Sequence, residues 1–397
     1  MTAGPQVKGW CPGALRPMLS GDGWMVRVRP HGGRLTQVQA QGIARLAALH
    51  GNGRIDISAR ANLQIRGVTE TSHTPLIVGL RDLGLIDPTP EAEARRNILV
   101  SPFWTPGDGT QDIAAALDKA LAAPDAPDLP GKFGFSIDPA RWPVLRKSSA
   151  DVRIERLPTG WLVRAEGFIV GALVASHAEA AEAAVELARW FVDIRDGAGS
   201  PGRMAGLWPK ETVQQRHRRL PGRFRHESGG IVWLETKRPS VGACPQGRLV
   251  GLAFGQTDAP ALAALADCGA LRLTPWRMLL VEGLAAPPGI PGLIHDPDDP
   301  LLNVIACTGA PGCPQALGET RALARDLAPQ VLPGMTLHVS GCAKGCAHPG
   351  PTDLTLTATG HGYDLIRNGS ASDTPSLTGL APETIRDFLK ASHAPHL

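Results

Sequence analysis

The chain has 397 residues, of which 43% are hydrophobic and 19% are charged, and its formal net charge is +3. This composition is typical of a globular protein with about two or three domains, and it excludes a largely disordered chain. The small charge gives no overall reason to bind nucleic acid or a membrane surface, and no run of roughly 18 apolar residues occurs. Residues 1–13 lack the apolar core of a secretion signal, so we expect a cytoplasmic protein.

The first predicted strands carry polar side chains at alternate positions. Arg27 and Arg29 occur in MVRVRPHGG, and Arg60, Gln64 and Arg66 occur in ARANLQIRG. Alternate residues of a strand share a face, so each set lies on one face while the apolar residues between them pack against a core. Two interpretations stay open: the arginines are solvated, or they line a polar cavity that binds a polycarboxylate ligand.

Further basic and amide side chains follow in the same half of the chain. Arg96 and Asn97 occur in ARRNIL, and Lys132 occurs in LPGKFGF. Amphipathic helices are predicted over residues 112–123 and 177–193. Residues 197–240 are rich in arginine, histidine and glycine and are predicted to be a basic linker. Such a linker is usually solvated, but it could also cover a ligand or dock an acidic electron donor.

Segments of the first half recur in the same order in the second half. The matched pairs are residues 9–12 with 242–245, 55–68 with 271–284, 97–100 with 303–306, 129–131 with 332–334, and 151–154 with 353–356. Collinear matches predict a pseudo-twofold architecture with a site between the repeats. We therefore expect an α+β fold with small αβ units at 1–92 and 241–296 and larger αβ domains at 93–196 and 297–397.

Four cysteines near the C-terminus form two close pairs in glycine-rich loops. Cys307 and Cys313 occur in CTGAPGC, and Cys342 and Cys346 occur in CAKGC. Two such pairs can converge on one centre, and four thiolates are the ligand set of a [4Fe-4S] cluster. Structural zinc prefers shorter gaps within each pair, so the spacing favours iron and sulfur, while a zinc site and ordinary buried cysteines are the alternatives.

Taken in order, MVRVRPHGGRLT, SARANLQIRG, ARRNIL, LPGKF and the paired-cysteine motif resemble the sulfite and nitrite reductase superfamily over nearly the whole chain. The resemblance implies two ferredoxin-like half-domains alternating with two larger αβ domains, the second of which carries the cluster. It implies that the four cysteines hold a [4Fe-4S] cluster and that Cys346 occupies the position that bridges to a sirohaem iron. It also implies that the basic residues clamp the carboxylates of a tetrapyrrole.

Within that superfamily, residues 10–36 and the short chain resemble the precorrin-3B synthases of aerobic cobalamin biosynthesis. Reductases usually have a second lysine after LP-x-KF, where this chain has Gly134, so the clamp differs and a sirohaem site is in doubt. The resemblance implies a monooxygenase that hydroxylates precorrin-3A at C20 and closes a γ-lactone. It implies O2 as a substrate and NADH as the indirect source of electrons, delivered by a partner reductase.

The residues and the resemblance together predict one substrate-binding set. Its members are Arg27, Arg29, Arg60, Gln64, Arg66, Arg96, Asn97 and Lys132. The resemblance also implies a mononuclear non-haem iron, but no two-histidine-one-carboxylate pattern stands out, and we assign neither its ligands nor a catalytic residue. Two alternatives remain: a sirohaem-dependent sulfite or nitrite reductase, and a non-catalytic tetrapyrrole carrier stabilised by zinc.

Overall fold

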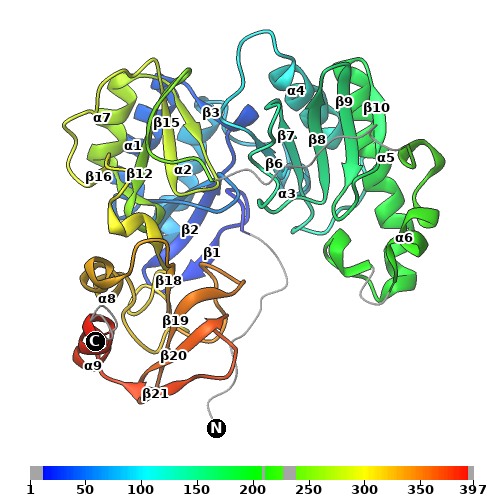
Figure 1. Ribbon diagram of the computed structural model, residues 1–397. Helices are drawn as coiled ribbons and strands as arrows, with labels where there is room; N and C mark the ends of the chain where they lie inside the picture. The colour runs from blue at the N-terminus through cyan, green and yellow to red at the C-terminus, as the bar shows by residue number, and fades with distance from the viewer. Residues whose placement is uncertain (1–11, 208–210, 227–237, 392–397) are drawn as a thin grey trace.

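The computed structural model describes residues 12–207, 211–226 and 238–391. Within these ranges the strands form four sheets, each with helices packed beside it. In Figure 1 the elements of the two half-domains lie together, with α1, α2 and α7 around strands β12 and β15. The sheet β6–β10 with α4 and α5 forms one separate lobe, and the sheet β17–β21 with α8 and α9 forms another. This α+β arrangement confirms the predicted fold class.

The first sheet belongs mainly to the N-terminal half-domain. Its strands, in spatial order, are β1 (Met18–Ser20), β2 (Gly23–Val28), β5 (Leu63–Val68), β4 (Arg54–Ile57) and β13 (Gln256–Asp258). Helices α1 (Gln37–His50) and α2 (Glu70–Asp82) each begin with a capping box, in which side chain and backbone satisfy each other's hydrogen bonds. The apolar residues that alternate with the polar set are fully buried, as the strand pattern predicts.

The third sheet belongs mainly to the second half-domain. Its strands, in spatial order, are β11 (Gly242–Cys244), β12 (Gly247–Leu252), β15 (Met278–Glu282), β14 (Leu271–Leu273) and β3 (Arg34–Leu35), with β16 (Leu293–Ile294) beside β12. Helix α7 (Ala259–Cys268) packs on α1. The short strands β3 and β13 are therefore exchanged between the half-domains, each pairing with the sheet of the other half.

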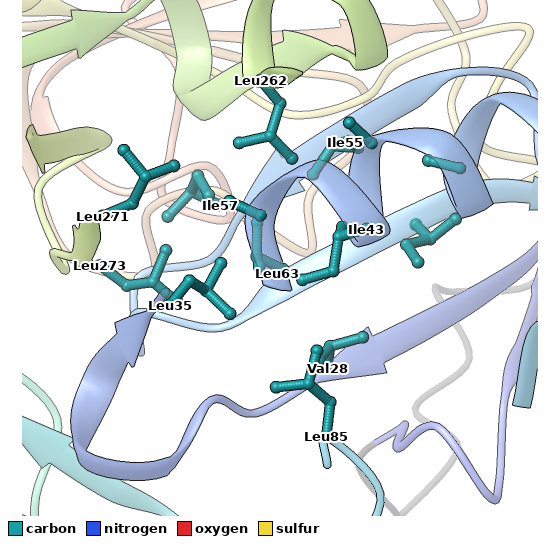
Figure 2. Close-up of a cluster of buried hydrophobic side chains, with 14 of the residues drawn as sticks. Val28, Leu35, Ile43, Ile55, Ile57, Leu63, Leu85, Leu262, Leu271 and Leu273 are labelled. Carbon is teal, nitrogen blue, oxygen red and sulfur yellow. The ribbon is translucent and has the colours of Figure 1, made fainter. Parts of the chain in front are cut away.

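The exchanged strands tie the halves together through a shared core and an ion pair. Figure 2 shows Leu35 and Ile43 from the first half close to Leu271 and Leu273 from the second, all fully or almost fully buried. Arg34 of β3 binds both carboxylate oxygens of Glu282 at 2.8 Å. These bonds, together with Arg272, lower the pKa of Glu282 to about 2 although partial burial opposes the shift.

The two larger αβ domains share one strand order and one pattern of pairing. The first contains β6 (Ile98–Val100), β7 (Phe135–Asp138), β8 (Val152–Leu157), β9 (Gly160–Ala165) and β10 (Ala172–Val174). The second contains β17 (Val304–Ala306), β18 (Leu337–Ser340), β19 (Thr352–Thr359), β20 (Gly362–Gly369) and β21 (Leu377–Leu380). In both sheets the first two pairings are parallel and the last two are antiparallel.

Helices and short 3-10 turns complete the described elements. The remaining helices are α3 (Pro90–Arg95), α4 (Thr110–Ala122), α5 (His177–Arg195), α6 (Val213–Arg219), α8 (Arg321–Leu327) and α9 (Pro382–Ala391). The 3-10 turns are η1 (His31–Gly33), η2 (Asp196–Ala198), η3 (Met204–Leu207), η4 (Gly222–Phe224), η5 (Ala253–Gly255), η6 (Pro300–Asn303) and η7 (Ala328–Gln330). Helices α4 and α5 confirm the two amphipathic helices predicted from the sequence.

The repeat extends to backbone conformation. Ala61 and Arg277 occupy matched positions in the turns β4–β5 and β14–β15, and both have a positive φ, of 52° and 64°. Gly32 and Phe254 likewise share a positive φ, of 60° and 57°, in η1 and η5. Residues other than glycine rarely adopt this conformation, so its recurrence confirms the predicted pseudo-twofold architecture.

The predicted basic linker contains residues that belong to a core. Met204, Leu207, Leu220 and Phe224 lie in the hydrophobic core beneath the sheet β6–β10. Residues 204–224 therefore pack on the first αβ domain where they are described, while the exact domain boundaries stay a prediction. A search of the described residues for a helix long and apolar enough to span a membrane found none.

Candidate functional site

The four cysteines lie in loops that follow two neighbouring parallel strands. Cys307 comes directly after β17, and Cys342 comes two residues after β18. Parallel strands end at the same edge of a sheet, so the two loops meet there. The Gly341 N–H donates to the Cys307 Sγ at 3.2 Å, which joins one cysteine loop to the other.

The thiols lie close enough to influence one another. Partial burial raises the pKa of the exposed residue Cys346, and the thiols of Cys342, Cys307 and Cys313 raise it further. The Lys344 ammonium, between the two cysteines of the second loop, lowers the same pKa. The four thiols therefore lie in one neighbourhood, as ligands of a common centre must.

Two glycines allow the loops to approach. Gly309 has a φ of +67°, and a Cβ there would lie 2.8 Å from the Thr320 backbone nitrogen. A Cβ on Gly341 would lie 2.8 Å from the Cβ of Ala316. Thr320 also fixes the first loop, because its hydroxyl donates to the Cys307 carbonyl at 2.7 Å. Larger residues at the glycines would push the cysteine loops apart.

The donor set fits an iron–sulfur cluster. Within the part of the chain that the structure describes, no three His, Cys, Asp or Glu side chains converge closely enough to hold one metal ion. A four-iron cluster makes no such demand, because each thiolate binds a different iron atom. The cysteine positions, the loop glycines and the N–H donated to Cys307 therefore suit such a cluster. No ligand set for a second, mononuclear iron emerges from the same residues.

The first half-domain reaches the cysteine loops through the β1–β2 hairpin. The Ser20 hydroxyl and the Gly21 N–H both donate to the Gly312 carbonyl, at 2.9 and 3.1 Å, directly before Cys313. Arg66 supports this hairpin, since its guanidinium binds both Asp22 carboxylate oxygens, at 2.6 and 3.0 Å, and the Ser20 hydroxyl at 3.0 Å. Arg66 was predicted to bind substrate, and in this structure its partner is a carboxylate of the chain itself.

A row of polar residues crosses the first sheet on the face opposite its apolar core. The strand register places Arg27 opposite Gln64, Gln64 opposite Asp56, and Asp56 opposite Gln256. At the start of α8, Arg321 binds Asp56 at 3.2 Å. This polar face therefore turns toward the αβ domain that carries the cysteines, and Arg27 and Gln64 are both half-buried there.

Two of the predicted arginines, Arg29 and Arg96, are buried in the first half and bind other groups of the chain there. Arg96 binds both oxygens of Asp87, at 2.7 and 2.8 Å, and donates to the Arg29 carbonyl at 2.7 Å. The Arg29 guanidinium donates to the carbonyls of Glu93 and Pro12. Burial opposes and the Asp87 carboxylate favours the charged form of Arg96, and its pKa is raised on balance.

Arg60 and Asn97 line one small cavity, and the backbone of Lys132 is bound to Arg60 beside it. Arg60 donates to the Lys132 carbonyl at 2.9 Å, and the Asn97 amide donates to the carbonyls of Gly131 and Phe133 at 3.1 and 3.0 Å. The cavity is lined by both Arg60 and Asn97, and also by Gly134. The Lys132 residue is exposed. The eight predicted residues thus fall into four groups, and their role as a substrate clamp stays a prediction.

A second basic group contains Arg277, which the sequence pattern did not single out, together with His338 and His348, which lie near the motif segments. Arg277 donates to the Ala347 carbonyl at 3.3 Å, next to Cys346, and the His338 and His348 rings lie 6.1 Å apart. Burial, then His348 and Arg277, lower the pKa of His338 to about 4. The internal repeat could have identified Arg277, because the matched segments align it with Ala61, the neighbour of Arg60.

Comparisons with known proteins agree with this geometry. Residues 16–83 match the family model described as the nitrite/sulfite reductase ferredoxin-like half domain. A precorrin-3B synthase from Sinorhizobium sp is 31% identical, covering 94% of this chain and 86% of the relative. A ferredoxin–nitrite reductase from Synechococcus elongatus is 25% identical, with the same shares of the two chains covered.

A solved structure shares the fold. The NirA protein of Mycobacterium tuberculosis superposes with a TM-score of 0.66 at 20% identity, over 94% of this chain and 82% of that one. Together with the matched half-domain and the duplicated sheets, these likenesses place the chain in the sulfite and nitrite reductase superfamily. Within it, this chain belongs to the precorrin-3B synthase family and is an oxidoreductase.

Proposed function

We propose that this protein converts precorrin-3A to precorrin-3B by hydroxylating C20 and closing a γ-lactone from the ring A acetate. The reaction would use O2 and electrons that originate from NADH and arrive through a partner reductase. The observation that carries the proposal is the 31% identity to a precorrin-3B synthase over 94% of the chain. The convergence of the four cysteines in that same chain supports it.

Cys307, Cys313, Cys342 and Cys346 would hold a [4Fe-4S] cluster, which supplies single electrons when bound. Burial raises the pKa of Cys346, and Lys344 opposes that rise and so favours the thiolate form that metal ligation requires. The Gly341 N–H donates to the Cys307 sulfur, a contact of the kind that tunes a cluster's potential. These groups prepare the site for a cluster before any substrate binds.

The tetrapyrrole carboxylates would bind the basic residues that the fold leaves near these loops. The members of the predicted set that would contact substrate most directly are Arg27, Gln64, Arg60 and Lys132, because the first three are half-buried and Lys132 is exposed, whereas the other four are buried. Arg29, Arg66, Arg96 and Asn97 would position them by holding the hairpin and the β6 region in place. Oriented binding of this kind lowers the entropic cost of reaction.

The alternative is a sirohaem-dependent sulfite or nitrite reductase. The nitrite reductases that are 25 and 26% identical favour it. Gly134 argues against it, because reductases usually have a lysine at this position, and a Cβ there would lie only 3.1 Å from the Asn97 carbonyl oxygen. This backbone contact leaves the position poorly suited to the second basic side chain of a sirohaem clamp.

The deciding experiment is the absorption spectrum and metal analysis of anaerobically purified protein, followed by addition of precorrin-3A, O2 and a chemical reductant. A brown shoulder bleached by dithionite, together with iron, sulfide and formation of the hydroxylated lactone, is the expected result. Extractable sirohaem would move the assignment to a sulfite or nitrite reductase. Stoichiometric zinc without labile sulfide, and no turnover, would indicate a tetrapyrrole carrier instead.

A further inference from the structure

Arg277 occupies a strained turn beside the second cysteine loop. Its φ of 64° lies in the left-handed region, which residues other than glycine adopt at a cost and mostly at functional sites. Its guanidinium donates to the Ala347 carbonyl at 3.3 Å, which places the charge next to Cys346. The strained turn therefore lies where the second half-domain meets the αβ domain that carries the cysteines.

His338 lies beside Arg277 with unused hydrogen-bonding capacity. The residue is 0% exposed, and neither of its ring nitrogens has a hydrogen-bond partner among the described residues. Its ring meets the His348 ring edge to face, with centroids 6.1 Å apart at 78°. A buried imidazole normally hydrogen-bonds through at least one nitrogen, so this ring has a donor that no described group uses.

The charge around these residues is strongly positive. Burial, and then the nearby guanidinium groups of Arg238 and Arg321, lower the pKa of Arg277 to about 10. Arg321 binds Asp56 at 3.2 Å, whereas the structure shows no carboxylate bound to Arg277 within its described residues. A guanidinium that has lost its water without gaining a counter-ion is costly, and the site repels a cation, so an anion is the ligand that stabilises it.

We propose that Arg277, His338 and His348 form an anion-binding site that holds a carboxylate of the tetrapyrrole beside the Cys346 loop. Arg277 and His348, which are half-buried, would donate to the anion, and the enclosed His338 ring lies against His348 and positions it. The pseudo-twofold repeat puts the Arg60 turn and the Arg277 turn at equivalent places, so the two would bind acidic groups on different parts of one ligand. The contacts described above are the evidence that this site binds an anion. That the anion is a tetrapyrrole carboxylate rests on the proposed function.

The test uses full-length protein and two probes: uroporphyrin III, a tetrapyrrole with carboxylate side chains, and inorganic phosphate. Arg277→Asn removes the charge and introduces a residue that tolerates the left-handed conformation. Arg277→Lys keeps the charge but lacks the paired N–H donors of the guanidinium. Arg54→Gln, at an exposed arginine of β4, is the matched control. We expect Arg277→Asn and His338→Gln each to weaken uroporphyrin binding about tenfold, Arg277→Lys to recover part of the loss, and Arg54→Gln to bind like wild type.

Further outcomes separate this site from the proposed function. Uroporphyrin binding that stays unchanged in folded Arg277→Asn would overturn the tetrapyrrole assignment of the site. If wild type binds no uroporphyrin but phosphate still raises the melting temperature of wild type and not of Arg277→Asn, the anion site stands and the tetrapyrrole function fails. If neither Arg277 nor His338 variants fold, phosphate protection of Arg277 from phenylglyoxal in wild type decides, and lack of protection rejects the site.

Discussion

The two αβ domains build the same sheet and fasten its loops in different ways. Strand β7 ends at Asp138 and strand β18 ends at the matched Ser340. The segment after β7 is held by arginine and carboxylate side chains, whereas the segment after β18 carries Cys342 and Cys346. One scaffold therefore supports two kinds of loop, and only one of them offers ligands for a metal cluster.

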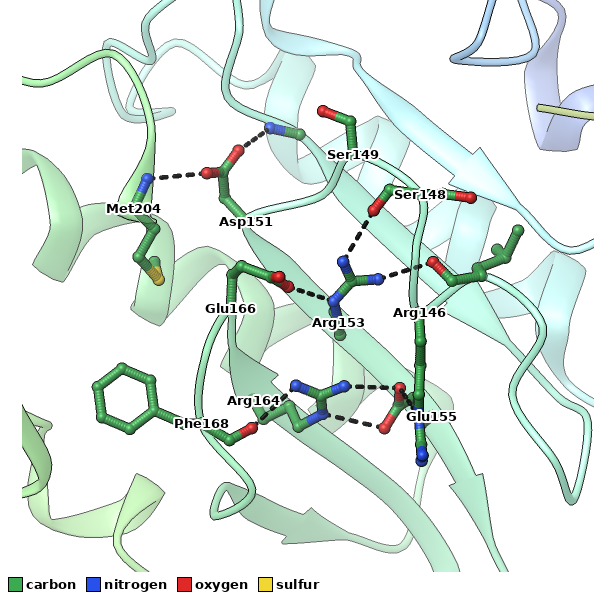
Figure 3. A network of polar contacts seen from close by, with 12 residues as sticks. Arg146, Ser148, Ser149, Asp151, Arg153, Glu155, Arg164, Glu166, Phe168 and Met204 are labelled. Carbon is green, nitrogen blue, oxygen red and sulfur yellow. Dashed lines mark hydrogen bonds and ion pairs between the residues drawn. The ribbon is translucent and has the colours of Figure 1, made fainter. Parts of the chain in front are cut away.

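The first domain holds its loop with a network of charged groups, shown in Figure 3. Arg164 binds both oxygens of Glu155, at 2.8 and 3.0 Å, and all but a few per cent of each residue is buried. Arg153 donates to the carbonyls of Leu145 and Ser148 at 2.9 and 2.8 Å, which fastens the loop to β8. These contacts make the loop part of the domain interior.

The second domain places small hydroxyl residues where the first has these charges. Thr355 and Thr357 of β19 match Arg153 and Glu155 of β8, and their hydroxyls donate to backbone carbonyls of Gly369 and Ala371. The side chains therefore turn toward the neighbouring strand instead of fastening the cysteine loop. The comparison indicates that a cluster bound by the cysteines would hold the loop after β18 in place, as ion pairs hold the loop after β7 in the other domain.

The largest expected effect comes from removing a cluster ligand. Cys346→Ser should lose most of the bound iron and sulfide, to about a tenth of wild type or less, because a hydroxyl binds iron far more weakly than a thiolate. Metal analysis and the visible spectrum measure the loss. Cys268→Ser, at an exposed thiol at the end of α7, is the control and should keep its iron. Full iron content in Cys346→Ser would refute the ligand assignment.

The next effect should be confined to the first αβ domain. Glu155→Ala leaves Arg164 buried without its carboxylate, which should destabilise this domain by about 3–5 kcal/mol while iron content stays unchanged. Hydrogen exchange of β8 and β19 amides would localise the change. Asp125→Ala removes a largely exposed pair with Arg189 and should cost less than about 1 kcal/mol. Equal loss of hydrogen-exchange protection in β8 and β19 would contradict the claim that each domain holds its loop by its own contacts.

Asp138 titrates and the matched Ser340 does not, so we expect the stability of the first αβ domain alone to depend on pH in this way. Burial raises the pKa of Asp138 from 3.8 to about 6, despite backbone N–H donors that oppose the shift. The folded state then binds a proton that the unfolded state has released, so stability falls by about 3 kcal/mol in total as pH rises from well below 3.8 to well above 6. Asp138→Ser, which installs the residue of the second domain, should flatten this slope in denaturant titrations. An unchanged slope would exclude Asp138 as its source.

The smallest expected effect is a difference in stability loss between variants of Asp151 and Asp353, which occupy matched positions in the repeat. Asp151 accepts hydrogen bonds from the Gly134 and Met204 N–H groups, at 2.9 and 2.8 Å, and binds Arg203 at 2.8 Å. Asp353 accepts one bond, from the Thr336 N–H at 2.7 Å. Asp151→Ala should destabilise its domain by about 2 kcal/mol more than Asp353→Ala, since more groups lose their partner. Equal losses in urea titrations would mean that the added contacts contribute nothing.

Much of the fold could be predicted because its signals are local. Alternation identified the faces of β2 and β5, the helical period identified α4 and α5, and matched segments identified the repeat. The two cysteine pairs predicted a common centre, and the structure places both cysteine loops after adjacent parallel strands, at one edge of the sheet. In each case the spacing of residue types along the chain determines the result.

Other features depended on contacts between distant segments. Strands β3 and β13 have two and three residues, too few to show a period, and their exchange depends on the core formed by both halves. The sequence marked Arg66 and Arg96 as basic, but only the fold paired them with Asp22 and Asp87. It also brought Arg277 to His338 beside the cysteines. Residue type sets which interactions are possible, whereas the partner of a buried charge depends on which groups the tertiary structure brings within reach once water is excluded.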